Sequence, residues 1–201
     1  MPGVKFTTLE STCVPLPVEN IDTDQIIPAR YLSATSREGF GEKLFYDWRY
    51  DRDGKPIMSF VLNNPLYSGS VLVAGHNFGC GSSREHAVWA LYDYGFRAVI
   101  SSFFADIFKN NALNNGLLPV VIPGEDLENL FMLIKKDPGM KVKINLDHQL
   151  LEIPKIRKAI RFDINPYKKE CLLKGLDDID YLLGLKDKIE DFERNRNRLQ
   201  K

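Results

Sequence analysis

The side chains best suited to chemistry are concentrated in one short stretch, GHNFGCGSSREHAVW, which runs from Gly75 to Trp89. It holds three glycines, two histidines, a glutamate, the adjacent serines Ser82 and Ser83, and Arg84. Short hydroxyl groups beside a guanidinium, on a glycine-rich backbone, are typical of a loop that binds an anion and acts on it as a nucleophile or base. The stretch therefore predicts a site for an anionic ligand.

Three familiar loop motifs do not fit this stretch. A Walker A loop has lysine before its hydroxyl residue, but here Gly81 precedes Ser82. The dinucleotide-binding fingerprint has a third glycine where this chain has Arg84. A nucleophile elbow needs a small glycine where this chain has the charged Glu85, so a serine hydrolase is disfavoured.

The remaining interpretation is an anion site at the start of a helix. Gly79 and Gly81 would allow backbone N–H groups to converge, the helix N-terminus would add partial positive charge, and Arg84 would offer two parallel donors to a carboxylate. Ser82 and Ser83 would add hydroxyl groups. A structural alternative stays open, in which Ser82 or Ser83 only caps the helix.

The sequence around the stretch predicts alternating strands and helices. Apolar runs indicate buried strands at 70–75, 96–102 and 117–122, with helices at 84–95 and 103–116 between them. This alternation implies parallel pairing with right-handed crossovers. The polar stretch then follows the carboxyl end of a strand, with its helix beginning near Ser83, which is where open α/β sheets usually bind ligands.

The rest of the chain extends this α/β pattern within a single domain, residues 1–201. The helix at 103–116 is expected to bury four apolar side chains: Phe104, Ile107, Phe108 and Leu113. Further elements are a helix at 125–136, a hairpin at 141–153 turning at Asp147 and His148, a strand at 160–164, and helices at 171–185 and 186–201. Residues 185–201 are polar enough to form a frayed helix or a tail.

Composition narrows the classes of partner. Lysine and arginine number 27, as do aspartate and glutamate, so no net field would attract a nucleic acid or an anionic membrane. An N-terminus without an apolar segment leads us to expect a cytoplasmic protein. The three scattered cysteines, Cys13, Cys80 and Cys171, predict neither disulfides nor the four-thiolate shell of an iron–sulfur cluster, and no metal site is expected.

Four segments carry a family resemblance: GCGSSREHA, NIDTDQIIPARYL, GFGEKLFYDWRY and GFRAVISSFFADIFKNNALNNGLLPV. They closely resemble the small subunits of 3-isopropylmalate dehydratase, over nearly the whole chain. That family is similar to the swivelling C-terminal domain of aconitase, whose GSSRE loop faces an iron–sulfur cluster. The resemblance implies a three-layer β/β/α domain that binds no cofactor itself and acts with a large subunit carrying the [4Fe–4S] cluster.

The resemblance also implies a reaction and residue roles. Water would be removed from 2-isopropylmalate, a small dicarboxylate of leucine biosynthesis, and added back with the hydroxyl on the neighbouring carbon. Ser82 would abstract the proton, which requires positive charge and N–H donors around a hydroxyl that is otherwise a very weak acid. Ser83 and Arg84 would hold carboxylate oxygens. Cys80 would be a small filler and His86 would orient the loop.

A second segment contributes by the same resemblance. Taken alone, Asp22 and Asp24 more often form Asx turns than act as acids, but Asp24 occupies the place of an aconitase residue close to the active site. The stretch YLSATSREGFG resembles a substrate-recognition loop. Arg30 and Arg37 are both candidates for a second carboxylate contact.

Alternatives remain at this stage. The motif FYDWRY could be a partner-binding hot spot or part of the core. The chain could serve a related citramalate or homocitrate dehydratase, or be a carboxylate-binding module that does no chemistry. The complete set Ser82, Ser83 and Arg84 favours a lyase subunit that is active only with its large subunit.

Overall fold

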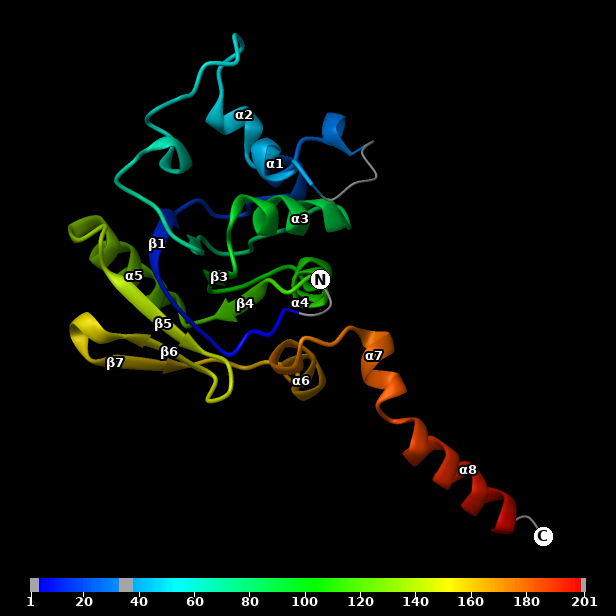
Figure 1. Ribbon diagram of the computed structural model, residues 1–201. Helices are drawn as coiled ribbons and strands as arrows, with labels where there is room; N and C mark the ends of the chain where they lie inside the picture. Colours follow the sequence, from blue (N-terminus) through cyan, green and yellow to red (C-terminus); the bar gives the residue numbers. More distant parts are fainter. Residues whose placement is uncertain (1–3, 33–37, 200–201) are drawn as a thin grey trace.

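The fold is built on one curled sheet of mixed α/β architecture (Figure 1). The computed structural model describes residues 4–32 and 38–199, without the side chains of 195 and 197–199. In this part of the chain, seven strands are arranged in the order β4-β3-β2-β1-β5-β6-β7. Their bounds are Thr8–Leu16 (β1), Val71–Ala74 (β2), Ala98–Ser101 (β3), Leu118–Val121 (β4), Lys141–Asn145 (β5), Leu150–Ile153 (β6) and Lys158–Arg161 (β7).

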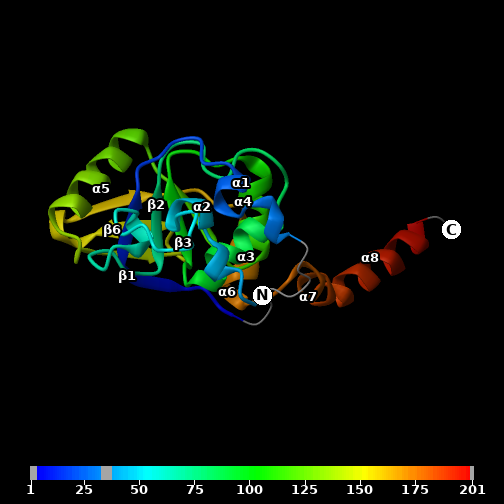
Figure 2. The same ribbon diagram turned by 90° about the horizontal axis from the view of Figure 1, so that it is seen from above.

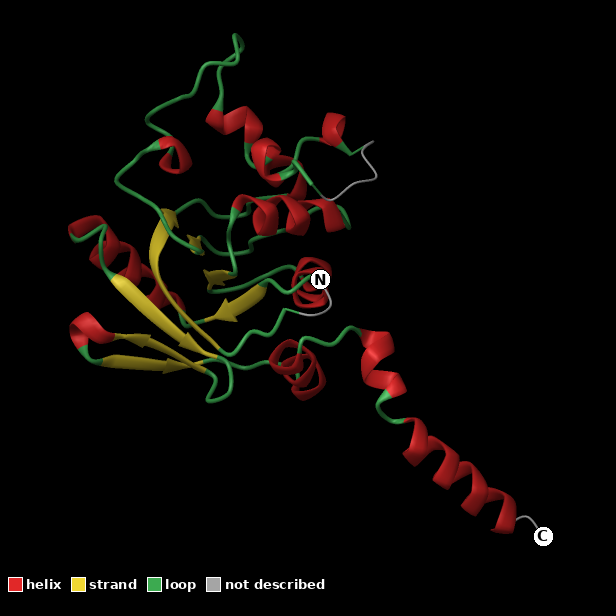
Figure 3. Ribbon diagram, in the orientation of Figure 1, coloured by secondary structure: helices red, strands yellow, loops and turns green. Residues whose placement is uncertain are grey.

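Helices cover the sheet and continue beyond it (Figure 3). The α-helices are Thr23–Ile26 (α1), Tyr46–Arg49 (α2), Glu85–Tyr94 (α3), Asp106–Asn114 (α4), Gly124–Lys136 (α5), Pro166–Lys174 (α6), Asp178–Leu183 (α7) and Lys186–Leu199 (α8). Short 3₁₀ helices are Ala29–Tyr31 (η1), Gly41–Lys43 (η2), Val61–Asn63 (η3) and Pro154–Ile156 (η4). None of the described helices combines the length and apolarity needed to cross a membrane.

Strand β1 joins the two halves of the sheet. It pairs in parallel with β2, from Cys13 opposite Val71 to Leu16 opposite Ala74, and antiparallel with β5. The pairs β2–β3 and β3–β4 are parallel, which confirms the pairing predicted from the strand–helix alternation. The hairpin β5–β6 is also confirmed. The fold class predicted from the sequence is therefore correct.

Two apolar clusters lie on opposite sides of the parallel strands. Because the sheet curls, one cluster joins parallel strands to β5–β7 and α5, through residues such as Val73, Leu130 and Ile144. The other lies beneath α1, α3 and α4 and contains Phe45, the first residue of FYDWRY, whose ring stacks on Trp48 at 5.5 Å. Within this motif Phe45 and Arg49 are buried, so core packing accounts for much of it.

The helix expected at 103–116 begins later, at Asp106. Residues 103–105 are extended because they pair with the polar stretch: the Phe78 N–H donates to the Phe103 carbonyl at 3.1 Å, and the Ala105 N–H to the Phe78 carbonyl at 3.2 Å. Phe104 and Phe108 are buried as expected, but Ile107 is 51% exposed. Successive residues on a helix differ by about 100°, so Ile107 turns away from the buried face that contains Phe108.

Two C-terminal predictions also need correction. The segment expected to form one helix at 171–185 is divided between α6 and α7, because α6 begins at Pro166 with Asn165 as its N-cap and ends at the left-handed Gly175. The strand expected at 160–164 is found at Lys158–Arg161, since the four residues of β6 set the length of its pairing. Figures 1 and 2 show α8 pointing away from the body of the protein.

Candidate active site

The polar stretch after β2 is held to the segment that follows β1. Its backbone carbonyls accept hydrogen bonds from the Asn20 N–H (at His76, 2.8 Å) and the Thr23 N–H (at Cys80, 2.9 Å). The two segments approach each other so closely that a Cβ on Gly75 would lie 2.3 Å from the Val18 carbonyl oxygen. The two segments singled out in the sequence, 60 residues apart, thus form one unit.

Glycines shape the middle of this loop. Gly79 and Gly81 both have positive φ, at +77° and +89°, and a Cβ on Gly79 would lie 2.2 Å from the Phe108 ring. The N–H groups of Gly79 and Cys80 converge, but on the Ile21 carbonyl oxygen, at 2.8 and 3.2 Å. These two donors therefore fix the loop rather than face a ligand, and the Gly79 N–H is not available to an anion.

Ser82 lies against Thr23. The Thr23 hydroxyl donates to the Ser82 carbonyl oxygen at 3.0 Å and lies 3.3 Å from the Ser82 hydroxyl. Because the hydrogen of the Thr23 hydroxyl is used in the bond to the Ser82 carbonyl, the Thr23 oxygen accepts the hydroxyl hydrogen of Ser82. Thr23 is 2% exposed, whereas Ser82 and Ser83 are exposed. The serine hydroxyl thus has a buried partner behind it and solvent in front.

Arg84 and Asp24 form an ion pair across the two segments. The Arg84 side chain is only 17% exposed, and its Nη1 meets Asp24 Oδ1. Since this contact uses one nitrogen, the guanidinium keeps further N–H groups for a second anion. Asp22 has a different role, because its side chain caps α1 and accepts from the Gln25 N–H at 2.7 Å. The structure therefore brings Asp24, Ser82 and Arg84 together.

The start of α3 excludes simple serine capping. The helix begins at Glu85, not near Ser83, and its N-cap is Arg84, with no side-chain hydrogen bond at the cap. Neither Ser82 nor Ser83 caps it, so the structural alternative for these residues is wrong. The positive end of the helix dipole instead lies directly beside the serines.

The first turn of α3 is braced by aromatic and amide contacts. His86 packs with Phe40 and Trp89, with ring centroids 5.4 and 4.6 Å apart. Asn115, after α4, donates to Glu85 at 2.9 Å and accepts from the Trp89 indole at 3.1 Å. The first turn of α3, which follows Arg84, is thus fixed to Phe40 on one side and to Asn115 on the other.

Arg30 lies in different surroundings. It pairs with Asp47 on α2, and its guanidinium stacks over the rings of Tyr31 and Tyr46 at 4.8 and 5.6 Å. Hydrogen bonds donated by Arg30 hold the pKa of the Asp47 carboxyl below its usual range. Among the described contacts, none joins Arg30 to Ser82 or Arg84. Arg37 lies outside the described residues.

The three cysteines lie on separate elements. Cys13 is in β1, Cys80 in the polar stretch and Cys171 in α6, and burial raises the pKa of Cys13 to about 12. Burial also raises the pKa of Cys80, with a smaller contribution from the Asp22 charge. A cluster needs several thiolates converging on one point, and these residues of the chain do not fit that requirement.

Sequence reasoning missed one functional neighbour, Thr23. Its hydroxyl is the group that contacts Ser82, yet in the sequence it stands between two more conspicuous carboxylates, Asp22 and Asp24. A threonine immediately after an N-cap residue is unremarkable in itself, so only the pairing of the two segments reveals its position.

Comparison with known proteins identifies the class to which this chain belongs. Residues 4–125, which include both site segments, match the family model of the aconitase C-terminal domain. The class of protein is therefore an aconitase-type C-terminal domain, with its loop between β2 and α3. A solved structure of 3-isopropylmalate dehydratase from Methanocaldococcus jannaschii is similar, with a TM-score of 0.65 and 30% identity, covering 93% of this chain and 99% of that one.

Curated relatives are more similar still. A 3-isopropylmalate dehydratase small subunit from Christiangramia forsetii is 59% identical over 192 residues, which is 96% of this chain and 94% of the relative. One from Cytophaga hutchinsonii is 57% identical over 190 residues, 94% of each chain. This chain belongs to the family of 3-isopropylmalate dehydratase small subunits.

Proposed function

We propose that this protein is the small subunit of a 3-isopropylmalate dehydratase, a hydro-lyase that converts 2-isopropylmalate into 3-isopropylmalate in leucine biosynthesis in the cytoplasm. The observation that carries the proposal is the joining of Asp24, Ser82 and Arg84 at the start of α3. Family membership supports the reaction, and the local geometry supports the role of each side chain.

Arg84 binds a substrate carboxylate in this proposal. Asp24 holds one nitrogen of the guanidinium, so the remaining N–H groups are oriented before substrate arrives. Ser83, exposed next to Arg84, donates to the same carboxylate. A second carboxylate contact is assigned to Arg30 or Arg37. Arg30 already pairs with Asp47, so it has a structural role even without substrate.

Ser82 acts as the base that takes a proton from the carbon next to a carboxylate. Only the alkoxide form of a serine is basic enough for this step, so the hydroxyl must first lose its own proton, and in bulk water at neutral pH almost all serine stays the neutral hydroxyl. Arg84 and the positive end of α3 both favour negative charge at this point. Their effect is weak while Ser82 faces solvent, so the site requires a partner that excludes water.

That partner is the large subunit, which we expect to carry the [4Fe–4S] cluster. The cysteines of this chain do not form a ligand set for it. This chain contributes proton transfer and carboxylate binding, and it is inactive alone. Anaerobic assay of the purified chain, with and without the large subunit, tests this division; turnover by the chain alone would contradict it.

Kinetics of the two-subunit complex test the roles. Ser82→Ala should lower kcat about a hundredfold or more with little change in KM, because a general base acts mainly in the transition state. Ser59→Ala, at another exposed serine, is the matched control. A Ser82→Ala complex with wild-type kcat would remove this serine from the mechanism.

Arg84→Lys should mainly raise KM. Lysine keeps the charge but loses the planar fork that can meet Asp24 and a carboxylate together. Assays with 2-isopropylmalate, citramalate and homocitrate separate the proposed substrate from its relatives, since only one should give efficient turnover. Preference for another of these acids would overturn the assigned substrate but not the reaction class.

A further inference from the structure

The C-terminal arm, residues 178–199 with α7 and α8, carries a concentration of exposed apolar side chains. Figures 1 and 2 show α8 extending away from the sheet and its covering helices. Five large apolar side chains on the arm are between 46% and 68% exposed: Ile179, Leu182, Leu183, Ile189 and Phe192. Such concentrated exposure is typical of a surface that contacts another protein.

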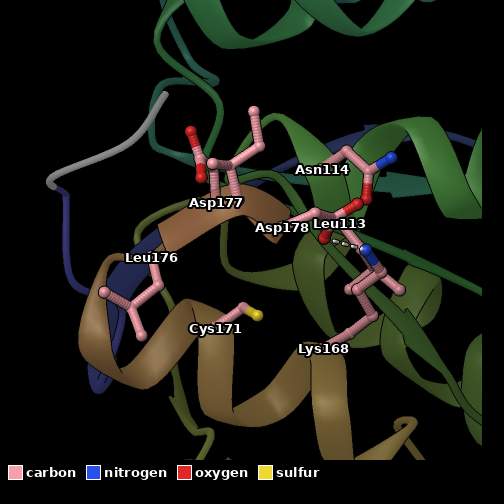
Figure 4. A pocket seen from close by; sticks show the side chains of 8 residues that line it. Leu113, Asn114, Lys168, Cys171, Leu176, Asp177 and Asp178 are labelled. Carbon is pink, nitrogen blue, oxygen red and sulfur yellow. Dashed lines mark hydrogen bonds and ion pairs between the residues drawn. The ribbon is translucent and has the colours of Figure 1, made fainter. Parts of the chain in front are cut away.

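The base of the arm is well anchored. Asp177 and Asp180 form a capping box at the start of α7. Asp178 accepts hydrogen bonds from Lys168 at 2.6 Å and Tyr167 at 2.5 Å. Figure 4 shows the Lys168–Asp178 pair bordering a pocket between α4, α6 and α7. These contacts set where the arm leaves the body of the protein.

The anchoring point adjoins the active-site helix. The same pocket is lined by Leu113 and Asn114 at the end of α4. The next residue, Asn115, donates to Glu85, the first residue of α3. One short turn of chain therefore contacts the base of the arm on one side and the start of α3 on the other.

Helix α8 has one apolar and one polar face. Ile189 and Phe192 are three residues apart and share a face. Asp187, Asp191 and Arg194 lie on the opposite face, where Arg194 and Asp191 pair at 2.7 Å. A helix of 14 residues is marginally stable alone in water. Burial of its apolar face against a partner would supply the missing stability.

The size of α8 decides whether its partner is a second copy of this chain or a different, larger surface. A helix about 21 Å long and about 10 Å wide has a footprint of roughly 200 Å², a small part of the roughly 800 Å² that each partner buries in a stable interface. Two copies joined only through α8 would not make a stable dimer. The helix instead fits as one part of a larger interface, such as the one that must cover the exposed serines.

We propose that the arm docks on the large subunit, with Ile189 and Phe192 in an apolar groove, beside the surface that closes over Ser82. This inference rests on the proposed function for its partner. The groove should be flanked by basic side chains near Glu193, and it should end in acidic ones near Arg196, which lies on the same face four residues after Phe192. The arm then holds the two subunits together without touching the substrate.

Affinity for the purified large subunit tests the proposal. The double variant Ile189→Asn, Phe192→Asn should raise the Kd at least about tenfold, as loss of central apolar anchors does in other interfaces. The control Asp191→Asn, Arg194→Asn changes the polar face of the same helix and should stay within about twofold, because exposed ion pairs contribute little. Both proteins should show wild-type circular dichroism and melting of the main domain.

Two results would overturn the inference. One is wild-type affinity of the apolar-face variant for the large subunit. The other is a stable dimer of the chain alone in light scattering that this variant makes monomeric, which would assign the arm to a second copy. Turnover of the wild-type complex is measured separately, so failure of the proposed reaction, with binding intact, is distinguished from failure of the docking surface.

Discussion

The active-site segments and the C-terminal arm are opposites in how they are held. Around Ser82 the backbone, a buried threonine and an ion pair are all joined to neighbouring elements. Beyond Leu183, the arm displays apolar side chains such as Phe192, which is 66% exposed. The contrast indicates that the chain holds its reacting groups in fixed positions, whereas it leaves the apolar side chains of the arm exposed for contact with a partner. Substitutions in the two regions should therefore differ in their effects.

The largest effect is expected at Gly79. Gly79→Ala should lower the free energy of unfolding by about 3 kcal/mol or more, because its φ is +77° and the new Cβ would overlap Phe108. Urea denaturation measures it. As a control, Gly124→Ala should stabilise by about 0.5 kcal/mol, since the space there is open. Equal stability of the two variants would show that the loop is not constrained as described.

A smaller loss is expected at Thr23. Thr23→Val keeps the volume but removes the hydroxyl that donates to the Ser82 carbonyl, so unfolding should become easier by about 1 kcal/mol. Turnover of the complex should fall further than stability alone explains, because the Ser82 hydroxyl loses its partner. A variant with normal stability and turnover would mean that Thr23 does not position the serine.

At the base of the arm the expected effect depends on pH. The hydrogen bonds from Lys168 and Tyr167 lower the pKa of Asp178, so the stability it contributes is present above its unfolded pKa of about 4 and is lost as pH falls through its lower folded value. Because the side chain is 56% exposed, the contribution should stay below about 1 kcal/mol.

Comparing the wild-type protein with Asp178→Asn at two pH values checks the direction of this pH dependence. Amide exchange of α7 should be faster in the variant at pH 7, and the difference should disappear at a pH below the lowered pKa of Asp178, where the wild-type carboxyl is also neutral. A difference of the same size at both values would indicate that the carboxylate charge is not what anchors α7.

The smallest effect is expected at the end of the arm. Phe192→Ala should change the free energy of unfolding of the chain alone by less than about 0.5 kcal/mol, because the ring is mostly solvated already. Chemical denaturation measures the change. A loss above about 1 kcal/mol would show that Phe192 packs within its own chain, which would remove the contrast between the two regions.

Much of the fold could be predicted because its signals are local. Buried strands β2, β3 and β4 are short apolar runs separated by amphipathic helices, so their parallel pairing followed. Strand β1 was not predicted. Only part of it is buried, and it contains Pro15, a residue that usually argues against a central strand. Its place in the sheet depends on partners far along the chain.

The site was predictable in composition but not in contacts. The types of Ser82 and Arg84 indicated anion chemistry. That Asp24 would meet Arg84, or that the Gly79 N–H would be used by the Ile21 carbonyl, required the pairing of two distant segments. The roles of Ser82, Ser83, Arg84, Arg30 and Arg37 in catalysis stay predictions until the kinetics are measured.

The central position of β1 has a consequence for synthesis of the chain. Strand β1, Thr8–Leu16, leaves the ribosome before both of its neighbours: it finds its parallel partner only when residues 71–74 emerge, and its antiparallel partner only when residues 141–145 do. At roughly 5 to 20 residues per second, the strand waits several seconds for each neighbour. Pairings so distant in sequence also slow folding. Until residues 141–145 emerge, the nascent chain therefore carries β1 with at least one edge unpaired, and this edge is what chaperones have most to protect.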